Sequence, residues 1–210
     1  MTNEKRENRR TAYTKRIIRE SLYELMLEKP LDKITVTQIC ERADINRSTF
    51  YTYYTDIYDL HQKIIAEFFE IQKGVISATK KLLESKADIT KLTVNDYFEI
   101  AYTYTITVKN NKELYKFIFN QNSTNSIHVS LGKAFYQMIY DFILPVFPEE
   151  HINDFKSSFT FIGGGTTSML MDWIKKDCSA ESKKIARSLA HYYYGVFNSF
   201  VQQTGVTGKN

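Results

Sequence analysis

The chain has 210 residues and a hydrophobic content of 43%, so it can bury a core as one large domain or as a small module fused to a larger one. Its apolar runs are far shorter than the roughly 20 residues of a membrane helix, and its N-terminus is too polar for a secretory signal. The two cysteines, Cys40 and Cys178, form no CxxC pair, as is typical of buried thiols in a reducing compartment. We therefore expect a cytoplasmic protein.

The net charge of +4 is concentrated at the N-terminus. Residues 1–19 hold seven basic and two acidic side chains, a net charge of +5, so the remaining 191 residues carry a net charge of −1. This distribution is expected of a basic arm that meets an anionic polymer, and residues 5–16 are the candidate arm. The alternative is a disordered, solvated tail that only aids solubility.

The pattern of apolar residues predicts helices along the whole chain, since no segment shows the sustained alternation of a strand. The first helix is predicted over residues 11–28, with Ile18, Leu22 and Leu25 on its buried side. Pro30 lies just beyond its end, where a proline is common because it cannot continue the helix.

The next two predicted helices are short and close together. Thr35 and Gln38 form a capping box that opens the second helix, which ends near residue 43. Asp44 follows in the turn, where a left-handed conformation costs aspartate less than most residues. The third helix is predicted over residues 47–53.

A long fourth helix begins after Asp56, which caps it. Its apolar residues recur at spacings of three and four: Ile57, Leu60, Ile64, Phe68, Ile71 and Val75. Further helices are predicted near 92–109, 111–120, 124–144, 149–177 and 180–203. The expected fold is all-α, with an N-terminal domain at residues 1–61 and a larger helical domain at residues 62–210.

The second and third helices, with their short connection, predict a helix-turn-helix, whose second helix enters the major groove of DNA. Phe50 and Tyr54 are four residues apart and are expected to pack inward. The opposite side offers arginine, hydroxyl groups and a tyrosine, and no acidic residue lies between positions 45 and 55. Arginine can pair with guanine through two hydrogen bonds, so this side suits DNA.

The segment TVTQICERADINRSTFYTYYTDIYDL, residues 35–60, resembles the DNA-binding module of tetracycline-repressor-type (TetR) regulators. The resemblance covers residues 11–65 and rests on the threonine-capped helix and on the Phe-Tyr-x-x-Tyr ending of the third helix. It implies a three-helix DNA-binding domain that the fourth helix joins to a C-terminal dimerisation and effector domain. The implied function is a homodimeric repressor of a palindromic, inverted-repeat operator in double-stranded DNA.

The resemblance also implies roles for individual residues. The recognition helix would comprise Arg47, Ser48, Thr49, Phe50, Tyr51, Thr52 and Tyr53. Base readout would fall to Arg47, Ser48, Thr52 and Thr37, and phosphate contacts to Thr35, Thr49, Tyr51 and Tyr53. The alternative for each threonine is a cap or a solvated hydroxyl, and for Tyr53 it is packing.

Two positions depart from the family pattern. Asp44 stands where glycine is usual, so the turn could carry about 1 kcal/mol of strain. Ile57 stands where a phosphate-contacting lysine is frequent, so that contact is expected to be missing or left to backbone amides at the helix N-terminus. The basic arm at residues 5–16 could compensate.

The last two predicted helices each carry an apolar stripe, and the family pairs such helices across a dimer. One stripe comprises Phe155, Phe159, Ile162, Thr166, Met169 and Trp173, and the other Ile185, Leu189, Tyr192, Val196 and Phe200. The rival interpretation is that both stripes face the core of their own chain. The glycines at 163–165 have no P-loop signature, and we expect close helix approach or a local helix break there.

The C-terminal domain is also rich in aromatic residues that could line a pocket for a flat small-molecule effector, or simply pack. They include Tyr97, Tyr102, Tyr104, Tyr115, Phe117, Phe119, Phe135 and Tyr140. No metal-ligand spacing or nucleophile motif is present, so we expect neither an enzyme nor a metal or resident cofactor. The alternative function is a co-regulator or activator whose C-terminal domain docks a protein partner.

Overall fold

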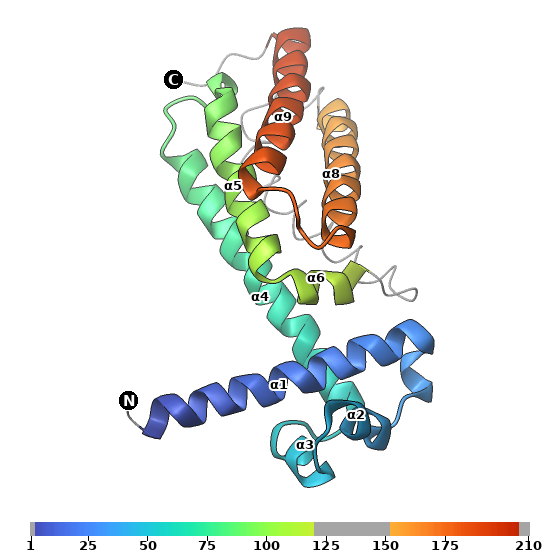
Figure 1. Ribbon diagram of the computed structural model, residues 1–210. Helices are drawn as coiled ribbons and strands as arrows, with labels where there is room; N and C mark the ends of the chain where they lie inside the picture. Colours follow the sequence, from blue (N-terminus) through green and yellow to red (C-terminus); the bar gives the residue numbers. More distant parts are fainter. Residues whose placement is uncertain (1–2, 120–151, 206–210) are drawn as a thin grey trace. The chain divides into compact units, whose positions relative to one another are not determined.

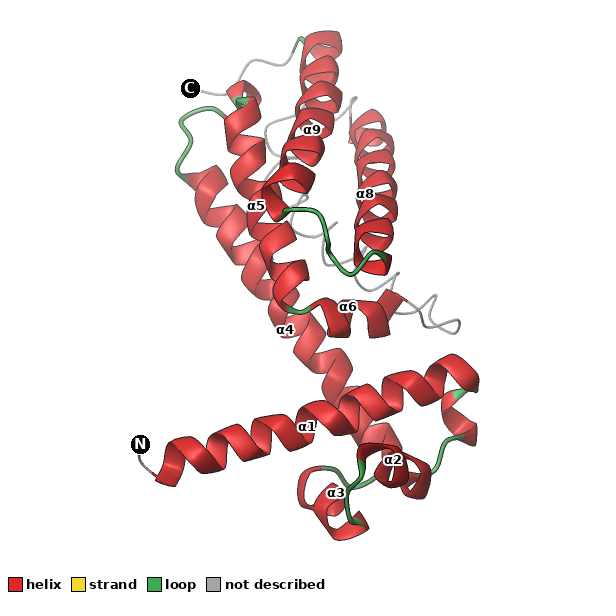
Figure 2. Ribbon diagram, viewed as in Figure 1, coloured by secondary structure: helices red, strands yellow, loops and turns green. Residues whose placement is uncertain are grey.

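The computed structural model describes residues 3–119 and 152–205, and these residues form helices joined by short loops, with no strand among them (Figure 1, Figure 2). They divide into two compact units. One unit comprises residues 3–69 and 117–119, and the other comprises residues 70–116 and 152–205. The predicted all-α fold is confirmed.

The first unit contains the predicted helix-turn-helix. Its helices are α1 (Asn3–Glu28), the short 3-10 helix η1 (Leu31–Lys33), α2 (Val36–Ala43), α3 (Arg47–Tyr53) and the beginning of α4 (Ile57–Glu84). Its core is apolar and almost fully inaccessible to solvent: Ile18, Leu22, Leu25, Ile39, Phe50, Leu60 and Ile64. The predicted buried side of the first helix is therefore confirmed.

The predicted start of the first helix at residue 11 is wrong, because α1 begins at Asn3. Residues 3–10 lack the apolar periodicity that set the predicted start, but they are rich in glutamate, lysine and arginine, which favour helix. The basic segment is thus helical, and the alternative of a disordered tail does not describe it.

The local signals around the turn are confirmed. The Thr35 hydroxyl accepts a hydrogen bond from the Gln38 amide at 3.3 Å, and Gln38 Oε1 accepts one from the Thr35 amide at 3.0 Å. Asp44 adopts the left-handed conformation, with φ of 51°. The Asp56 carboxylate accepts from the Asp59 amide at 2.8 Å and caps α4.

The second unit contains the rest of α4, the 3-10 helix η2 (Ile89–Lys91), α5 (Val94–Asn110), the first five residues of α6 (Lys112–Phe119), α8 (Ile152–Lys175) and α9 (Ser182–Thr204). Helices α5 and α9 pack side by side, and α8 packs on α9 (Figure 1). One core cluster joins Leu83, Leu92, Tyr97 and Ala190. The helix predicted at 124–144, with Phe135 and Tyr140, lies outside the described residues.

Of the two expectations for the glycines at 163–165, the local helix break is wrong. Helix α8 continues through them without a break, and a Cβ atom added at any of them would have no neighbour within 4 Å in the described part of the chain. Close approach by another helix is not seen among residues 3–119 and 152–205, and it stays a prediction for these glycines.

The two apolar stripes divide between the core and the surface. Four of their residues are buried within the chain, namely Phe155, Trp173, Leu189 and Phe200. Tyr192 on α9 is 60% exposed, and Phe161, beside the other stripe on α8, is 74% exposed. The own-core interpretation therefore holds for the four buried residues, while an exposed apolar surface remains on α8 and α9.

Candidate nucleic-acid interface

One side of α3 anchors the helix to its unit. Phe50 is fully buried, and its ring lies 5.6 Å from the ring of Tyr54, which is also buried. Burial raises the pKa of Tyr54 and keeps its phenol neutral. Because α3 has only seven residues, this packing, not intrinsic propensity, holds it in place.

The opposite side of α3 is exposed and carries Arg47, Ser48, Tyr51 and Thr52. Arg47 Nη2 donates a hydrogen bond to the Tyr51 hydroxyl at 3.3 Å, and this bond raises the pKa of the guanidinium. The Thr52 hydroxyl donates to the Ser48 carbonyl at 3.0 Å. The structure thus brings three predicted base-reading residues together and places Tyr51, predicted to hold phosphate, against the arginine.

The two threonines of α2 lie at its N-terminus, and both are exposed. Thr35 is the cap, so its oxygen is already engaged by the Gln38 amide, although its hydroxyl proton can still be donated. Thr37 is in the first turn. The cap interpretation therefore describes Thr35, and a phosphate contact there would be an additional role.

Two acidic side chains lie at the N-terminus of α4. Ile57 is only 9% exposed, and the carboxylates of Asp56 and Asp59 occupy the amides of Asp59 and Thr55. The Thr55 amide and the Lys63 ammonium lower the pKa of Asp59, so its carboxylate stays charged. The Asp59 amide is therefore already bonded, and a phosphate contact by the other amides at the start of α4 stays a prediction.

Several cations of the first unit are paired with acidic side chains. Arg42 bonds Glu28 at 2.7 Å, Arg16 bonds Glu20 at 3.0 Å, Lys63 bonds Asp59 at 2.9 Å, and Arg19 pairs with Glu67. By contrast, Arg10, Lys15 and Arg47 have no acidic partner among the side chains of residues 9–119 and 153–205. The unpaired cations can serve an external anion.

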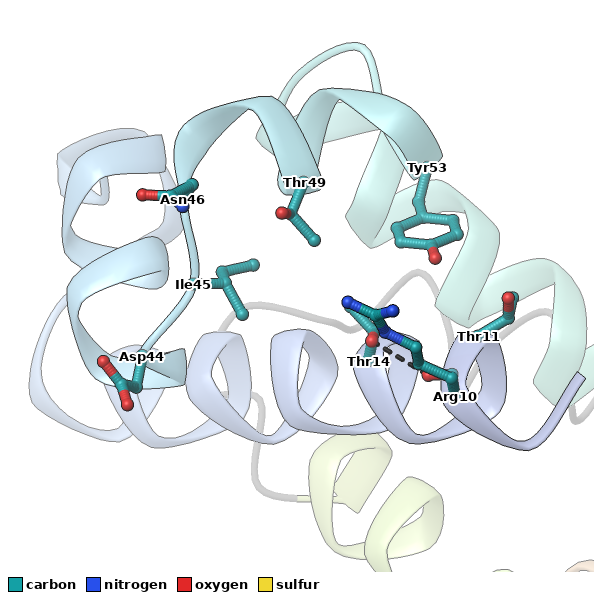
Figure 3. A pocket seen from close by; sticks show the side chains of 8 residues that line it. All are labelled: Arg10, Thr11, Thr14, Asp44, Ile45, Asn46, Thr49 and Tyr53. Carbon is teal, nitrogen blue, oxygen red and sulfur yellow. Dashed lines mark hydrogen bonds between the residues drawn. The ribbon is translucent and has the colours of Figure 1, made fainter. Parts of the chain in front are cut away.

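A groove separates the N-terminal half of α1 from the turn and α3 (Figure 3). Its volume is about 440 Å³, and its lining residues are Arg10, Thr11, Thr14, Asp44, Ile45, Asn46, Thr49 and Tyr53. Lys15 lies next to it, with its Nζ atom 5.5 Å from the centre of the Tyr53 ring. Thr49 and Tyr53, both predicted to contact phosphate, therefore line one groove, apart from the exposed side of α3.

Sequence reasoning missed this groove. Arg10 was predicted only as part of a basic arm, and Thr11, Thr14 and Asn46 were assigned no role. No local pattern could have joined them, because residues 10 and 53 meet only through the packing of α1 on the helix-turn-helix.

Within residues 3–119 and 152–205, no helix has both the length and the apolar character needed to cross a membrane. In the same residues, no three histidine, cysteine, aspartate or glutamate side chains gather as metal ligands would.

Comparisons with known proteins indicate similarity to transcriptional regulators. A TetR-type family model, described as transcriptional regulator C-terminal region, matches residues 95–195. No curated protein sequence matches the chain significantly.

Solved structures share the fold at low sequence identity. The fatty acid degradation regulator FadR from Bacillus halodurans is 11% identical over 84% of this chain and 92% of its own, with a TM-score of 0.54. A candidate fatty acid metabolism regulator from Clostridium perfringens is 14% identical over 92% of this chain and 100% of its own, with a TM-score of 0.56. A candidate TetR-family regulator from Mesorhizobium loti is 15% identical over 92% of this chain and 98% of its own, with a TM-score of 0.44. Residues 95–195 therefore match the C-terminal region of TetR-type transcriptional regulators, and the chain shares the fold of the solved regulators from Bacillus halodurans and Clostridium perfringens.

Proposed function

We propose that this regulator is a homodimeric repressor that binds an inverted-repeat operator through α3 and leaves it when an effector binds the C-terminal unit. The observation that carries DNA binding is the exposed side of α3, which offers Arg47 and three hydroxyl groups and no carboxylate. Arg47, Ser48 and Thr52 are proposed to read bases, with Thr37 beside them. Thr35, Thr49, Tyr51 and Tyr53 are proposed to hold phosphates. Such a protein acts in the cytoplasm.

Binding to a labelled duplex tests this proposal. The duplex carries the region upstream of the protein's own gene, and a scrambled duplex of equal length and composition is the control. We expect the specific duplex to bind at least about 10³-fold more tightly at physiological salt. Equal affinity for the two duplexes would contradict sequence-specific regulation.

A second copy of the chain is the proposed partner of the exposed surface on α8 and α9. Phe161 and Tyr192 are large, apolar and exposed, and the glycines at 163–165 leave room for close approach by another helix. A dimer would also present two copies of α3 to half-sites one helical turn, about 34 Å, apart or a multiple of it.

Phe161→Asp is expected to raise the dissociation constant of the dimer at least about tenfold, because it places a charge in an apolar contact. Leu27→Asp is the matched control, since Leu27 is 56% exposed and lies in the other unit. Sedimentation of both variants measures the effect. A wild-type protein that stays monomeric would contradict the dimer and favour a different protein as the partner of this surface, as in the co-regulator alternative.

The core of the second unit offers polar groups to a small-molecule effector. Burial raises the pKa of Tyr104 to about 12, with a hydrogen bond to Gln72 opposing the rise. The Tyr193 and Thr166 hydroxyls share a hydrogen bond of 2.9 Å. Gln72 is buried, and its Oε1 atom, unlike its amide group, has no hydrogen-bond partner among the described residues. An unpaired buried acceptor is costly, and an effector that donates a hydrogen bond would remove the cost.

Gln72→Met is therefore expected to leave the fold and DNA binding intact and to reduce effector release. In a reporter strain, the variant should keep the target promoter repressed under conditions that release the wild type. The exposed Gln62 provides the control variant Gln62→Met. Normal release by Gln72→Met would exclude Gln72 as an effector contact.

The release itself is a shift of equilibrium, since an effector weakens DNA binding only by its preference for the conformer that binds DNA poorly.

A further inference from the structure

Four helices of the second unit bring neutral polar side chains into one cluster, which comprises Gln72, Tyr104, Thr166 and Tyr193. The amide group of Gln72 on α4 forms a hydrogen bond with the Tyr104 phenol on α5. Burial raises the pKa of Tyr193 on α9, and the nearby Tyr104 phenol adds to the rise. The Tyr193 hydroxyl also shares a hydrogen bond of 2.9 Å with Thr166 on α8. The polar cluster thus connects all four helices.

The polar cluster borders an open space on α8. Gly163 lies three residues before Thr166, so the two share one side of the helix. A Cβ atom added at Gly163 would have no neighbour within 4 Å in the described part of the chain, although this glycine is only partly exposed. By contrast, Gly164 and Gly165 are exposed and lie one turn from Phe161, on the surface proposed for the dimer. Gly163 therefore leaves room beside the polar cluster and not at the dimer surface.

Gln72 gives the polar cluster an unused hydrogen-bond acceptor. Its side chain is 6% exposed, and Oε1 has no hydrogen-bond partner among the described residues. An amide oxygen only accepts, so the ligand atom that satisfies it must carry a hydrogen. A buried acceptor without a partner destabilises the folded chain, and a hydrogen bond from a ligand recovers that cost on binding.

No charged side chain is buried among the described residues of the second unit. Apart from tyrosines, the buried polar side chains there are an amide and three hydroxyls, those of Gln72, Thr79, Thr105 and Ser182. A charged ligand would lose its hydration in this core without gaining a counter-ion, which costs far more than burying a neutral polar group. The rings of Tyr97 and Tyr193, whose centres are 6.4 Å apart, add flat apolar surface. This environment suits an uncharged aromatic molecule.

We propose that the polar cluster binds an uncharged aromatic effector that carries a hydroxyl group, a molecule of the phenol class. The hydroxyl donates to Gln72 Oε1, and the ring occupies the space beside Gly163. This inference names the chemical class of the effector in the proposed function and rests on that function.

The probe is 2-naphthol, and its binding to the wild-type protein is measured by calorimetry without DNA. Two molecules with the same rings are the controls, because the methyl ether of 2-naphthol has no donor and 2-naphthoate carries a negative charge. We expect 2-naphthol to bind at least about tenfold more tightly than either control. The proposal is overturned if either control binds as tightly as 2-naphthol, or if none of the three binds.

Gly163→Leu is expected to weaken 2-naphthol binding at least about tenfold, because the new side chain fills the space that the ring needs. Gly74→Leu is the matched control, since Gly74 is helical, belongs to the same unit and also has open space around it among the described residues, but is exposed. Equal weakening by the two variants would remove the ring from the space beside Gly163.

Gln72→Met is expected to keep its affinity for the methyl ether and to lose the preference for 2-naphthol. An unchanged preference in this variant would overturn the hydrogen bond to Gln72, whether or not Gly163→Leu folds.

The outcomes separate this inference from the function on which it rests. If 2-naphthol binds with the expected preference but does not release the protein from its operator, the ligand class stands and the effector-controlled function fails. If the reporter strain shows release while 2-naphthol binds no better than its controls, the ligand class is overturned and the proposed function stands.

Discussion

Replacing Arg47 with alanine is expected to weaken operator binding about ten- to hundredfold and to relax the preference at one base pair in each half-site. Arg47 lies on the exposed side of α3, and its bond to Tyr51 orients the guanidinium before DNA arrives. Affinities for the operator and for duplexes substituted at single positions measure the effect.

Arg47→Lys is the control, because lysine keeps the charge and loses the planar pair of donors. We expect it to retain affinity for random DNA and to lose much of the discrimination. Equal losses by Arg47→Ala on operator and random DNA would remove Arg47 from base readout and make it a phosphate contact.

Replacing Phe50 with alanine is expected to destabilise the DNA-binding unit by about 3–5 kcal/mol, because the ring is fully buried and leaves a cavity. Loss of α3 packing should also abolish operator binding. Hydrogen exchange measured on separate peptides reports the effect locally, which matters because a chain of two units need not unfold in one step.

The neighbouring Tyr51→Ala is the matched control for stability. Tyr51 is 49% exposed, so its loss should change the stability of the unit by no more than about 0.5 kcal/mol. Protection in α2 and α3 should fall in Phe50→Ala alone, while α5 and α9 stay protected in both variants. Unchanged protection of α3 in Phe50→Ala would contradict its role as the anchor.

Local chemistry made much of the first unit predictable. A capping box needs only the side chains of Thr35 and Gln38, and the left-handed turn needs only a residue such as Asp44 that tolerates it. The division of α3 follows from helical spacing, which sends Phe50 and Tyr54 inward and Arg47 outward. These features lie within a few residues of one another, so the sequence contains them directly.

The features that were missed depend on distant residues or on helix propensity without periodicity. The groove joins Arg10 to Tyr53 through tertiary packing. The extension of α1 to Asn3 has no apolar stripe to reveal it. The helix break expected at the glycines 163–165 is wrong, because a glycine lowers the stability of a helix without always ending it.

Footprinting on the DNA beside the protein's own gene tests the central claim most directly. The account predicts protection of an inverted repeat whose half-site centres lie one helical turn, about 34 Å, apart or a multiple of it, with weaker protection by Arg47→Ala. Protection of a single unrepeated site would contradict the dimer. If no site is protected until the protein concentration is high enough to cover DNA of any sequence, operator recognition is contradicted.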